Sequence, residues 1–375
     1  MHLLLLMLPM VSSCIKTFTP DIRSKDVNKY VITGQITDGD GSQTINISRT
    51  APIAIPQYIP VTKCMVRILD DKGHEFLLSE AGNGDYNTII DPAYLIPGNS
   101  FKLEVITPNG DEINSDFDQM MGCPEVDSVY FIRKDIEGNN PGQFTRGIQL
   151  YIDLNGSATN SRNYRWDVVE TWEYHTDYPL EWYYDGTFHQ VTPPDYSRNV
   201  CWSTKKVPAI YTLTTENLTE NKYRMLPLHY VSNRTSRLMY GYSVLIRQYA
   251  LSQAAYIYWD QMRVNSSQEG GLYTTQPLPV KGNLHNLTHP EEEVLGFFGA
   301  TSLRAKRIFI RKVEGLTLDF STYCKPSMPQ VWIFTPSEYP IYFINSMYGR
   351  QVITEECVNC LMLGGINEKP DFWPN

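Results

Sequence analysis

The chain has 375 residues and a formal net charge of −9, with 32 Lys and Arg residues against 41 Asp and Glu residues. The absence of a basic cluster argues against nucleic-acid binding, because that affinity comes largely from neutralising phosphates with Lys and Arg. It also argues against adhesion to anionic lipid through a basic surface. Abundant aromatic residues, few charged ones, and Gly and Pro at short intervals are typical of an exported β-rich protein.

The first fourteen residues carry the pattern of a lipoprotein signal peptide. An apolar run over residues 3–11 leads into Ser12, Ser13 and Cys14. Small residues at positions 12 and 13 would give a lipoprotein signal peptidase access to the backbone, and the run is well short of the ~20 residues that span a bilayer. We expect a signal peptide over residues 1–13 and lipidation of Cys14.

An ordinary secretory signal is the alternative, because only His2 stands where Lys or Arg is expected before the apolar run. Both interpretations place the protein outside the cytoplasm. Residues 14–28 are polar and lack periodicity, which predicts a lipidated tether between membrane and fold.

Residues 29–122 predict an N-terminal β-sandwich of the Ig-like or transthyretin-like type. Short β-type runs separated by Asp- and Gly-rich turns recur here at residues 30–36, 43–48, 65–69, 75–79, 101–107 and 113–117. Residues 60–87 contain a strand, a turn, a second strand and a Gly-Asp-Tyr step, and this stretch resembles the carboxypeptidase-regulatory-like sandwich. Such modules usually act as spacers or interaction domains.

Residues 123–375 predict a larger β-rich domain with one inserted α-helix. Strand-like runs cover residues 126–133, 147–154, 164–174, 239–248 and 305–312. The helix is expected over residues 252–265, with Ser252 as its N-cap and an inner face made by Ala254, Ala255, Tyr258 and Met262. The whole chain is therefore expected to be mainly β.

The densest aromatic stretch of the chain covers residues 164–202. Strand alternation makes Trp166 a core residue. The segment Trp182, Tyr183 and Tyr184 instead follows a proline and is flanked by acidic residues, which is typical of an exposed loop or hairpin tip. We name Trp172, Trp182, Tyr183 and Tyr184 as candidate ligand or partner contacts, with structural packing as the alternative.

Six cysteines remain once Cys14 is assigned to lipid, and an even number outside the cytoplasm favours disulfides. Cys64 and Cys123 lie in the first third of the chain, and the other four lie further on: Cys201, Cys324, Cys357 and Cys360. Each half holds an even set, so we predict pairing within halves. The CxxC spacing at residues 357–360 is also found in redox and zinc sites, but no second CxxC accompanies it.

No catalytic constellation, metal site or cofactor motif is expected. His285, His289 and Glu293 are spaced by four, as a helical metal site would require, but the adjacent Pro290 favours strand and loop. Carboxylates that could serve a glycosidase are scattered through the second region (Glu170, Asp177, Glu181), and any protein of this size offers such pairs.

Several segments together resemble a lipoprotein family of the Bacteroidota that is catalogued as domain of unknown function 4249. They are YVITGQITDGDGSQTINISRTAP, PVTKCMVRILDDKG, YSVLIRQYALSQAAYIYW, GGLYTTQPLPVKGNL, EEEVLGFFGATSLRAKRIFI and CVNCLMLGGINEKPDFW. Members of this family are similar to lipoproteins encoded beside TonB-dependent receptors of the SusC type. The resemblance implies lipidation at Cys14, a sandwich followed by a larger domain, and no catalytic residue.

The resemblance also implies that Cys201, Cys324, Cys357 and Cys360 form the disulfide set. Four cysteines allow three pairings. We expect Cys324 to join either Cys357 or Cys360, leaving the other for Cys201. Cys64 stands where the family leads us to expect a small residue, so a pair with Cys123 would be an addition of this chain.

These features predict a lipid-anchored outer-membrane protein that acts as a non-catalytic accessory or ligand-capture subunit of a TonB-dependent import system. Its partner would be a SusC-type receptor, and its ligand an oligosaccharide or oligopeptide. The alternatives are a surface hydrolase that trims substrate before import and a structural or adhesive envelope protein. Residues 15–18 lack the acidic side chains associated with surface export, so cell-surface and periplasmic orientations both stay open.

Overall fold

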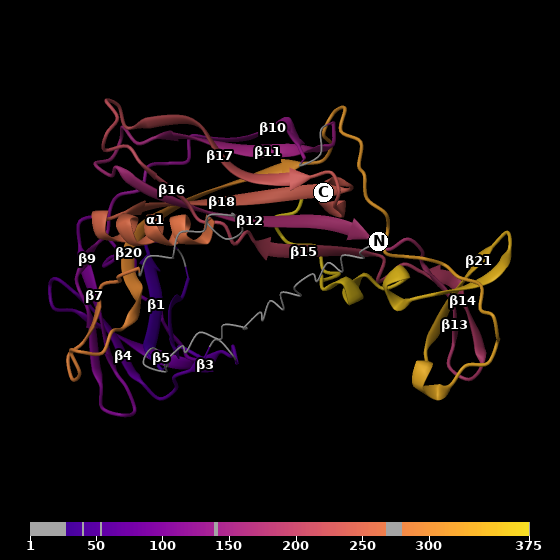
Figure 1. The fold of residues 1–375 in the computed structure, drawn as a ribbon, viewed down its shortest axis with the longest axis horizontal. Helices are drawn as coiled ribbons and strands as arrows, with labels where there is room; N and C mark the ends of the chain where they lie inside the picture. The colour runs from indigo at the N-terminus through magenta and orange to yellow at the C-terminus, as the bar shows by residue number, and fades with distance from the viewer. Residues whose placement is uncertain (1–27, 40, 53–54, 139–141, 268–279, 375) are drawn as a thin grey trace, which may run out of the picture.

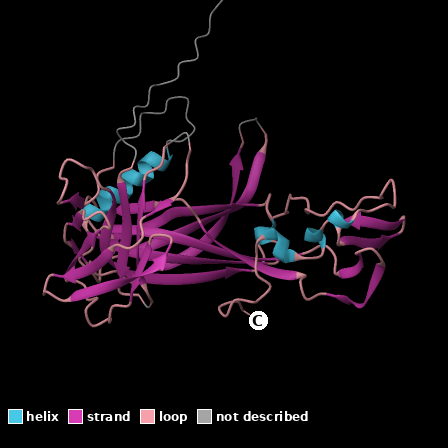
Figure 2. Ribbon diagram, turned by 90° about the horizontal axis from the view of Figure 1, so that it is seen from below, coloured by secondary structure: helices cyan, strands magenta, loops and turns pink. Residues whose placement is uncertain are grey.

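The computed structural model describes residues 28–39, 41–52, 55–138, 142–267 and 280–374. The chain is mainly β with one α-helix among these residues, as predicted (Figures 1 and 2). The predicted signal peptide and Cys14 lie outside the described residues. Most strands belong to one sheet of fifteen strands, whose main path runs β15-β12-β18-β20-β1-β2-β6-β5-β4-β7-β8-β19.

The N-terminal unit is a β-sandwich with its own core. Its strands from this part of the chain are β1 (Tyr30–Thr37), β2 (Gln43–Arg49), β3 (Ile59–Pro60), β4 (Met65–Asp70), β5 (Glu75–Gly82), β6 (Asp85–Thr88), β7 (Ser100–Ile106), β8 (Glu112–Ser115) and β9 (Asp118–Gln119). Alternate residues of β1, β2, β4 and β7 point inward, which brings Ile32, Ile45, Ile68 and Leu103 into one fully buried cluster.

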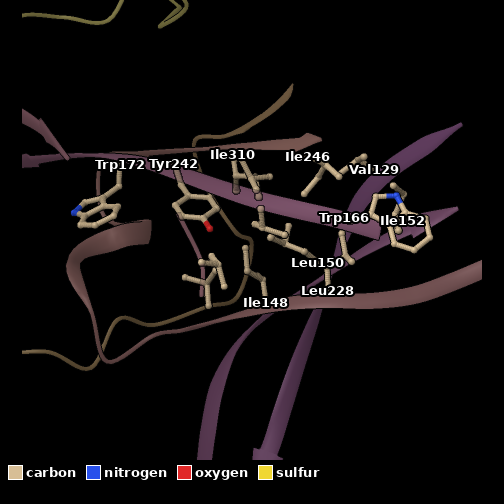
Figure 3. Packing of buried hydrophobic residues seen from close by; sticks show 14 of the residues in the cluster. Val129, Ile148, Leu150, Ile152, Trp166, Trp172, Leu228, Tyr242, Ile246 and Ile310 are labelled. Atoms are coloured by element: carbon tan, nitrogen blue, oxygen red, sulfur yellow. The ribbon is translucent and has the colours of Figure 1, made fainter. Parts of the chain in front are cut away.

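A second sandwich follows, in which a three-stranded sheet packs on one face of the large sheet. The strands of this region are β10 (Ser128–Glu137), β11 (Phe144–Asn155), β12 (Asn163–His175), β15 (Val200–Lys206), β16 (Tyr211–Thr214), β17 (Lys222–Ser232), β18 (Gly241–Leu251), β19 (Leu284–Asn286) and β20 (Leu295–Ile310). The sheet β10-β11-β17 contributes Ile148, Leu150 and Leu228, which meet Trp166 and Ile246 of the large sheet (Figure 3).

The long strand β20 joins the two sandwiches into a continuous sheet. Its first half pairs in parallel with β1, from Val31 opposite Leu295 to Thr37 opposite Thr301. Its second half pairs antiparallel with β18. The short strand β19 pairs with β8. The N-terminal unit therefore contains strands from the region that the domain prediction assigned to residues 123–375.

The helix α1 (Gln253–Ser267) covers the face of the large sheet opposite to the three-stranded sheet. Ser252 caps it, since its Oγ accepts a hydrogen bond from the Ala255 amide at 3.1 Å. Ala255 and Tyr258 are buried as predicted, and Met262 packs partly buried beside them. Ala254 is exposed, which corrects the predicted inner face, because it lies one position away from the stripe that α1 turns to the sheet.

A separate four-stranded sheet, β14-β13-β21-β22, stands at the end of the molecule away from the N-terminal unit (Figures 1 and 2). Its strands are β13 (Leu180–Tyr184), β14 (Phe188–Asp195), β21 (Ile341–Ser346) and β22 (Gly349–Ile353). We call this sheet, together with residues 324–340, the distal lobe. Short 3₁₀ turns lie at η2 (Ser236–Leu238), η3 (Pro336–Glu338), η4 (Glu355–Cys357) and η5 (Cys360–Leu363).

Two disulfides attach the distal lobe to the large sheet through the CxxC segment. Cys360 bonds to Cys201 on β15, and Cys357 bonds to Cys324 at the start of the lobe's loop. This is one of the arrangements left open by the sequence, with Cys324 joined to Cys357. The two cysteines of the CxxC segment are not paired with each other, because each bonds to a distant partner. The segment therefore has a structural role.

The predicted pair of Cys64 and Cys123 is wrong, because both thiols are free. Cys64 packs against the core of the N-terminal unit, whereas Cys123 is buried in the core between β12, β18 and the three-stranded sheet. The two thiols thus belong to different hydrophobic cores. Burial raises the pKa of the Cys123 thiol to about 12, so it stays protonated and unreactive at neutral pH.

Candidate ligand and partner contact sites

The structure divides the four predicted contact residues between two places. Trp172 lies on β12 and lines a groove of about 530 Å³, while Trp182, Tyr183 and Tyr184 lie together on β13 in the distal lobe. Only 8% of Trp172 is exposed, since most of its ring belongs to the core (Figure 3). Trp172 and Trp182 are therefore close in the sequence but lie at different places in the structure.

The groove beside Trp172 is basic, and we call it the basic groove. The Arg237 guanidinium lies 4.6 Å from the centre of the Trp172 ring, and the Lys205 ammonium lies 5.8 Å from it. Arg234 also lines the groove, and Asp319 is its acidic member. Cations held against an aromatic ring are suited to an anionic or hydroxyl-bearing ligand.

Behind this groove, Glu170 is a buried ion-pair partner with no free role as an acid. Arg237 Nε donates to it at 3.0 Å, and Tyr242 donates at 3.1 Å. Burial opposes ionisation of Glu170, but the neighbouring His229 and Arg237 outweigh it and hold the pKa below its ordinary value. A general acid needs a raised pKa, so this environment favours a structural role for Glu170.

One face of the distal lobe's sheet is aromatic. Trp182 lies opposite Phe343 on β21, and Tyr184 lies opposite Phe188 across the β13–β14 turn. The Phe188 and Phe343 rings are 5.2 Å apart between centroids. The Arg350 guanidinium lies 3.9 Å above the Trp182 ring. Strand alternation places these side chains together, and they form an aromatic cluster on this face around the buried ring of Phe343.

The loop between the disulfide and β21 covers part of this face and adds further rings. Trp332 stacks on Phe343 with centroids 5.8 Å apart and planes 9° apart, and Tyr339 meets Tyr184 edge-on at 5.2 Å. The lobe leaves large apolar side chains in solvent: Phe188, Met328, Val331, Trp332, Ile333, Met347 and Tyr348. Exposed apolar side chains of this size make the lobe a candidate interaction surface.

Tyr183 points to the other face of the lobe. Its ring stacks on His189 at 4.6 Å, and His189 in turn bonds to Asp185 at 2.8 Å. This face packs toward the Cys324–Cys357 disulfide through Tyr342, Ile344 and Ile353. Tyr183 is thus separated from Trp182 by the thickness of the sheet.

Sequence reasoning missed the second half of the aromatic surface. Residues 331–343 lie about 150 positions downstream of Trp182, and only tertiary pairing of β13 with β21 brings them together. The alternating aromatic pattern of VWIF at residues 331–334 was the available signal.

The histidines with four-residue spacing do not converge. His285 lies on β19 and contacts Asp116 at 3.1 Å, whereas His289 lies beyond the strand, 3.6 Å from Asp111. Among the described residues no group of three His, Cys, Asp or Glu side chains is arranged to hold a metal ion. None of the described helices combines the length and apolarity needed to cross a membrane.

Comparison with family models identifies the chain as a member of one protein family. The model of the DUF4249 family, described as a domain of unknown function, matches residues 15–307, so the chain belongs to this family. The matched region includes α1 and nearly all of the strands of the two sandwiches, and it ends before residues 324–340 and before β21 and β22 of the distal lobe. No curated protein matches the chain.

Similarity to solved structures is weak. A DUF4785 family protein from Legionella pneumophila is 11% identical over 58% of this chain and half of that chain, with a TM-score of 0.16. A structure described as manganese lipoxygenase of Gaeumannomyces graminis with a partial structure of zonadhesin of Komagataella pastoris is 10% identical, over 62% of this chain and 91% of that chain, with a TM-score of 0.17. Neither score supports an argument about fold or function.

Proposed function

We propose that this protein is a lipid-anchored accessory or ligand-capture subunit of the outer membrane, without catalytic activity, that acts with a TonB-dependent receptor of the SusC type. Its ligand would be an oligosaccharide or an oligopeptide. The observation that carries the proposal is the distal lobe, where exposed aromatic and aliphatic side chains are held on a sheet attached by two disulfides. The lipoprotein assignment is supported by the sequence pattern of residues 1–14, and the receptor partnership rests on the resemblance described under Sequence analysis.

The lobe is suited to contact because two disulfides attach it and it lies away from the main body (Figure 1). Planar side chains bury much area at a low cost in conformational entropy, and they accommodate sugar rings, peptides or a protein partner. Ile333 in its loop is 80% exposed. Exposure of so large an apolar side chain does not stabilise a monomer in solution, so it favours a role in contact.

The test is purification of the tagged protein from its native host in mild detergent, followed by mass spectrometry of the proteins that accompany it. Ile333→Glu is compared with Ile89→Glu, because both isoleucines are 80% exposed and Ile89 lies in the N-terminal unit. We expect a stoichiometric TonB-dependent receptor with the wild type and the Ile89 variant, and at least a fivefold loss with the Ile333 variant.

Recovery of the protein alone in all three purifications would contradict a stable receptor complex. Equal recovery of the receptor with both variants would support the complex but would show that Ile333 of the distal lobe is not part of the contact. Anchoring is tested separately with Cys14→Ala, which we expect to move the protein from the membrane fraction to the soluble fraction of the envelope.

A further inference from the structure

A second candidate site lies between α1 and the large sheet, at the junction of the two sandwiches and away from the distal lobe (Figure 1). It is a cavity of about 290 Å³ whose floor comes from β1, β2 and β20 and whose roof comes from Ala255, Tyr258 and Trp259 of α1. Its volume corresponds to roughly ten water molecules at their liquid density. The cavity is therefore large enough for a small molecule.

Arg165 is the basic residue of this cavity, and it is 94% buried. Its guanidinium lies between two rings, 4.0 Å from the centre of Trp259 and 4.6 Å from the centre of Tyr249. Stacking on both sides fixes the plane of the guanidinium. A buried, oriented arginine is costly unless an anion or acceptor meets it.

The acid nearest to Arg165 does not balance it. Asp167 Oδ2 is 3.8 Å from Arg165 Nη2, but the same oxygen accepts a hydrogen bond from Lys206 at 2.7 Å. Burial works against ionisation of Asp167, yet Arg165 and Lys206 together hold its pKa below the ordinary value. Two cations thus share this carboxylate, so Asp167 alone does not neutralise Arg165.

Two buried hydrogen-bond donors in the cavity wall have no acceptor among the residues that the structure describes: Arg165 Nε and Gln35 Nε2. Arg165 Nη2 donates to Gln35 Oε1 at 2.8 Å, and this fixes the amide orientation because a guanidinium nitrogen only donates. The NH₂ of Gln35 is therefore directed away from the arginine's bond. Unsatisfied donors of this kind are rare in folded proteins and call for an acceptor.

We propose that this cavity binds a small carboxylate with an apolar body, with Arg165 and Gln35 holding the carboxylate and Tyr258, Trp259 and Phe297 enclosing the rest. One carboxylate supplies acceptor oxygens and a negative charge beside the Arg165 guanidinium. Aromatic and aliphatic walls favour an apolar body. The site goes beyond the proposed receptor partnership and does not depend on it.

Asp118 limits where the ligand's charge can lie. It also lines the cavity, and its two oxygens accept hydrogen bonds from Ser252 at 2.5 Å and from the Ala300 amide at 2.8 Å. At neutral pH its negative charge would repel a carboxylate placed beside it. The ligand's carboxylate therefore belongs at Arg165, and its apolar part faces Asp118.

The experiment is calorimetric titration of the purified soluble protein with indole-3-acetate and octanoate, each compared with its uncharged amide, indole-3-acetamide and octanamide. We expect saturable binding of at least one carboxylate, at least tenfold tighter than its amide. In Arg165→Met the preference for carboxylate should disappear, and in Gln35→Leu it should fall about threefold. Arg307→Met is the matched control, since Arg307 also stacks on a ring, 3.6 Å from Phe372, outside the cavity.

Thermal unfolding and circular dichroism establish that each variant is folded before its titration is interpreted. Equal affinity for carboxylate and amide in the wild type would overturn the proposal, as would an unchanged preference in Arg165→Met. Failure of both carboxylates to saturate would also overturn it and would leave solvent as the occupant of the cavity. None of these results bears on receptor co-purification, so this proposal and the proposed function fail separately.

Discussion

The large sheet and the distal lobe are both antiparallel β-structures in most of their pairings, yet they are stabilised in different ways. The large sheet buries β-branched and aromatic residues between layers, including Ile32, Trp166 and Ile246 at 0% exposure. The lobe has four short strands and cannot enclose a comparable core, as expected for so small a sheet. Disulfides attach it to the rest of the chain, and several of its aromatic residues, including Phe188, Trp332 and Tyr348, remain partly in solvent.

This difference separates a part of the molecule that is stabilised by packing from a part that is stabilised by disulfides. A well-packed body tolerates little change in volume, whereas a braced lobe can expose apolar side chains without losing its shape. The proposed contact surface therefore lies in the part of the molecule where disulfides supplement a small core. Four predictions test this comparison.

The largest effect is expected from Trp166→Ala in the body. Trp166 is fully buried, and its Nε1 donates to Gln248 at 3.0 Å. Removing the ring leaves a cavity and an unpaired amide oxygen, so the free energy of unfolding should fall by about 3–5 kcal/mol. Chemical denaturation measures it. A loss below about 1 kcal/mol would show that the body does not depend on close packing.

The next effect is expected from removing the lobe's disulfide in the double variant Cys324→Ala and Cys357→Ala. This bond closes a loop with a sequence separation of 33, and the chain-entropy model assigns such a loop about 3.7 kcal/mol. Hydrogen exchange should show lost protection in β21 and β22 with β12 and β18 unchanged. Cys64→Ala, at a free thiol, is the control. If the double variant and Cys64→Ala showed the same hydrogen-exchange protection, the disulfide would not be what stabilises the lobe.

A third prediction concerns Asp118, where the two sandwiches meet. Burial raises its pKa to about 6 against an ordinary value of 3.8, despite hydrogen bonds from Ser252 and the Ala300 amide. The folded state then holds this proton more tightly than the unfolded state. The contribution of Asp118 to the free energy of unfolding should therefore fall as pH rises from about 4 to about 6, by at most about 3 kcal/mol.

Asp118→Asn removes this titration. The difference in unfolding free energy between wild type and variant should change with pH between about 4 and 6 and become constant above about 7. Urea denaturation at a series of pH values measures it. Parallel pH profiles for the two proteins would show that the carboxyl does not titrate abnormally.

The smallest effect on stability is expected from Trp332→Ala in the lobe. Trp332 is 48% exposed, and its main partner is the stacked ring of Phe343. A partly exposed aromatic pair contributes about 0.5–1.5 kcal/mol, so the thermal midpoint should shift by only a few degrees. A destabilisation as large as that of Trp166→Ala would show that the lobe's aromatic surface is a core.

Local patterns in the sequence determined the β class, the helix and its Ser252 cap, because these depend on side chains within a few positions of one another. They also placed Trp166 in the core through strand alternation. The same patterns assigned Ala254 to the wrong helix face, since a shift of one position there moves a side chain off the buried stripe.

Tertiary structure alone decided the contacts between distant segments. The parallel pairing of β1 with β20 joins residues about 265 positions apart, and the cavity at Arg165 exists only because that pairing lies under α1. The free state of Cys64 and Cys123 follows from their separate cores. Pairings of this kind depend on which complete surfaces fit together, and no short window of sequence contains that information.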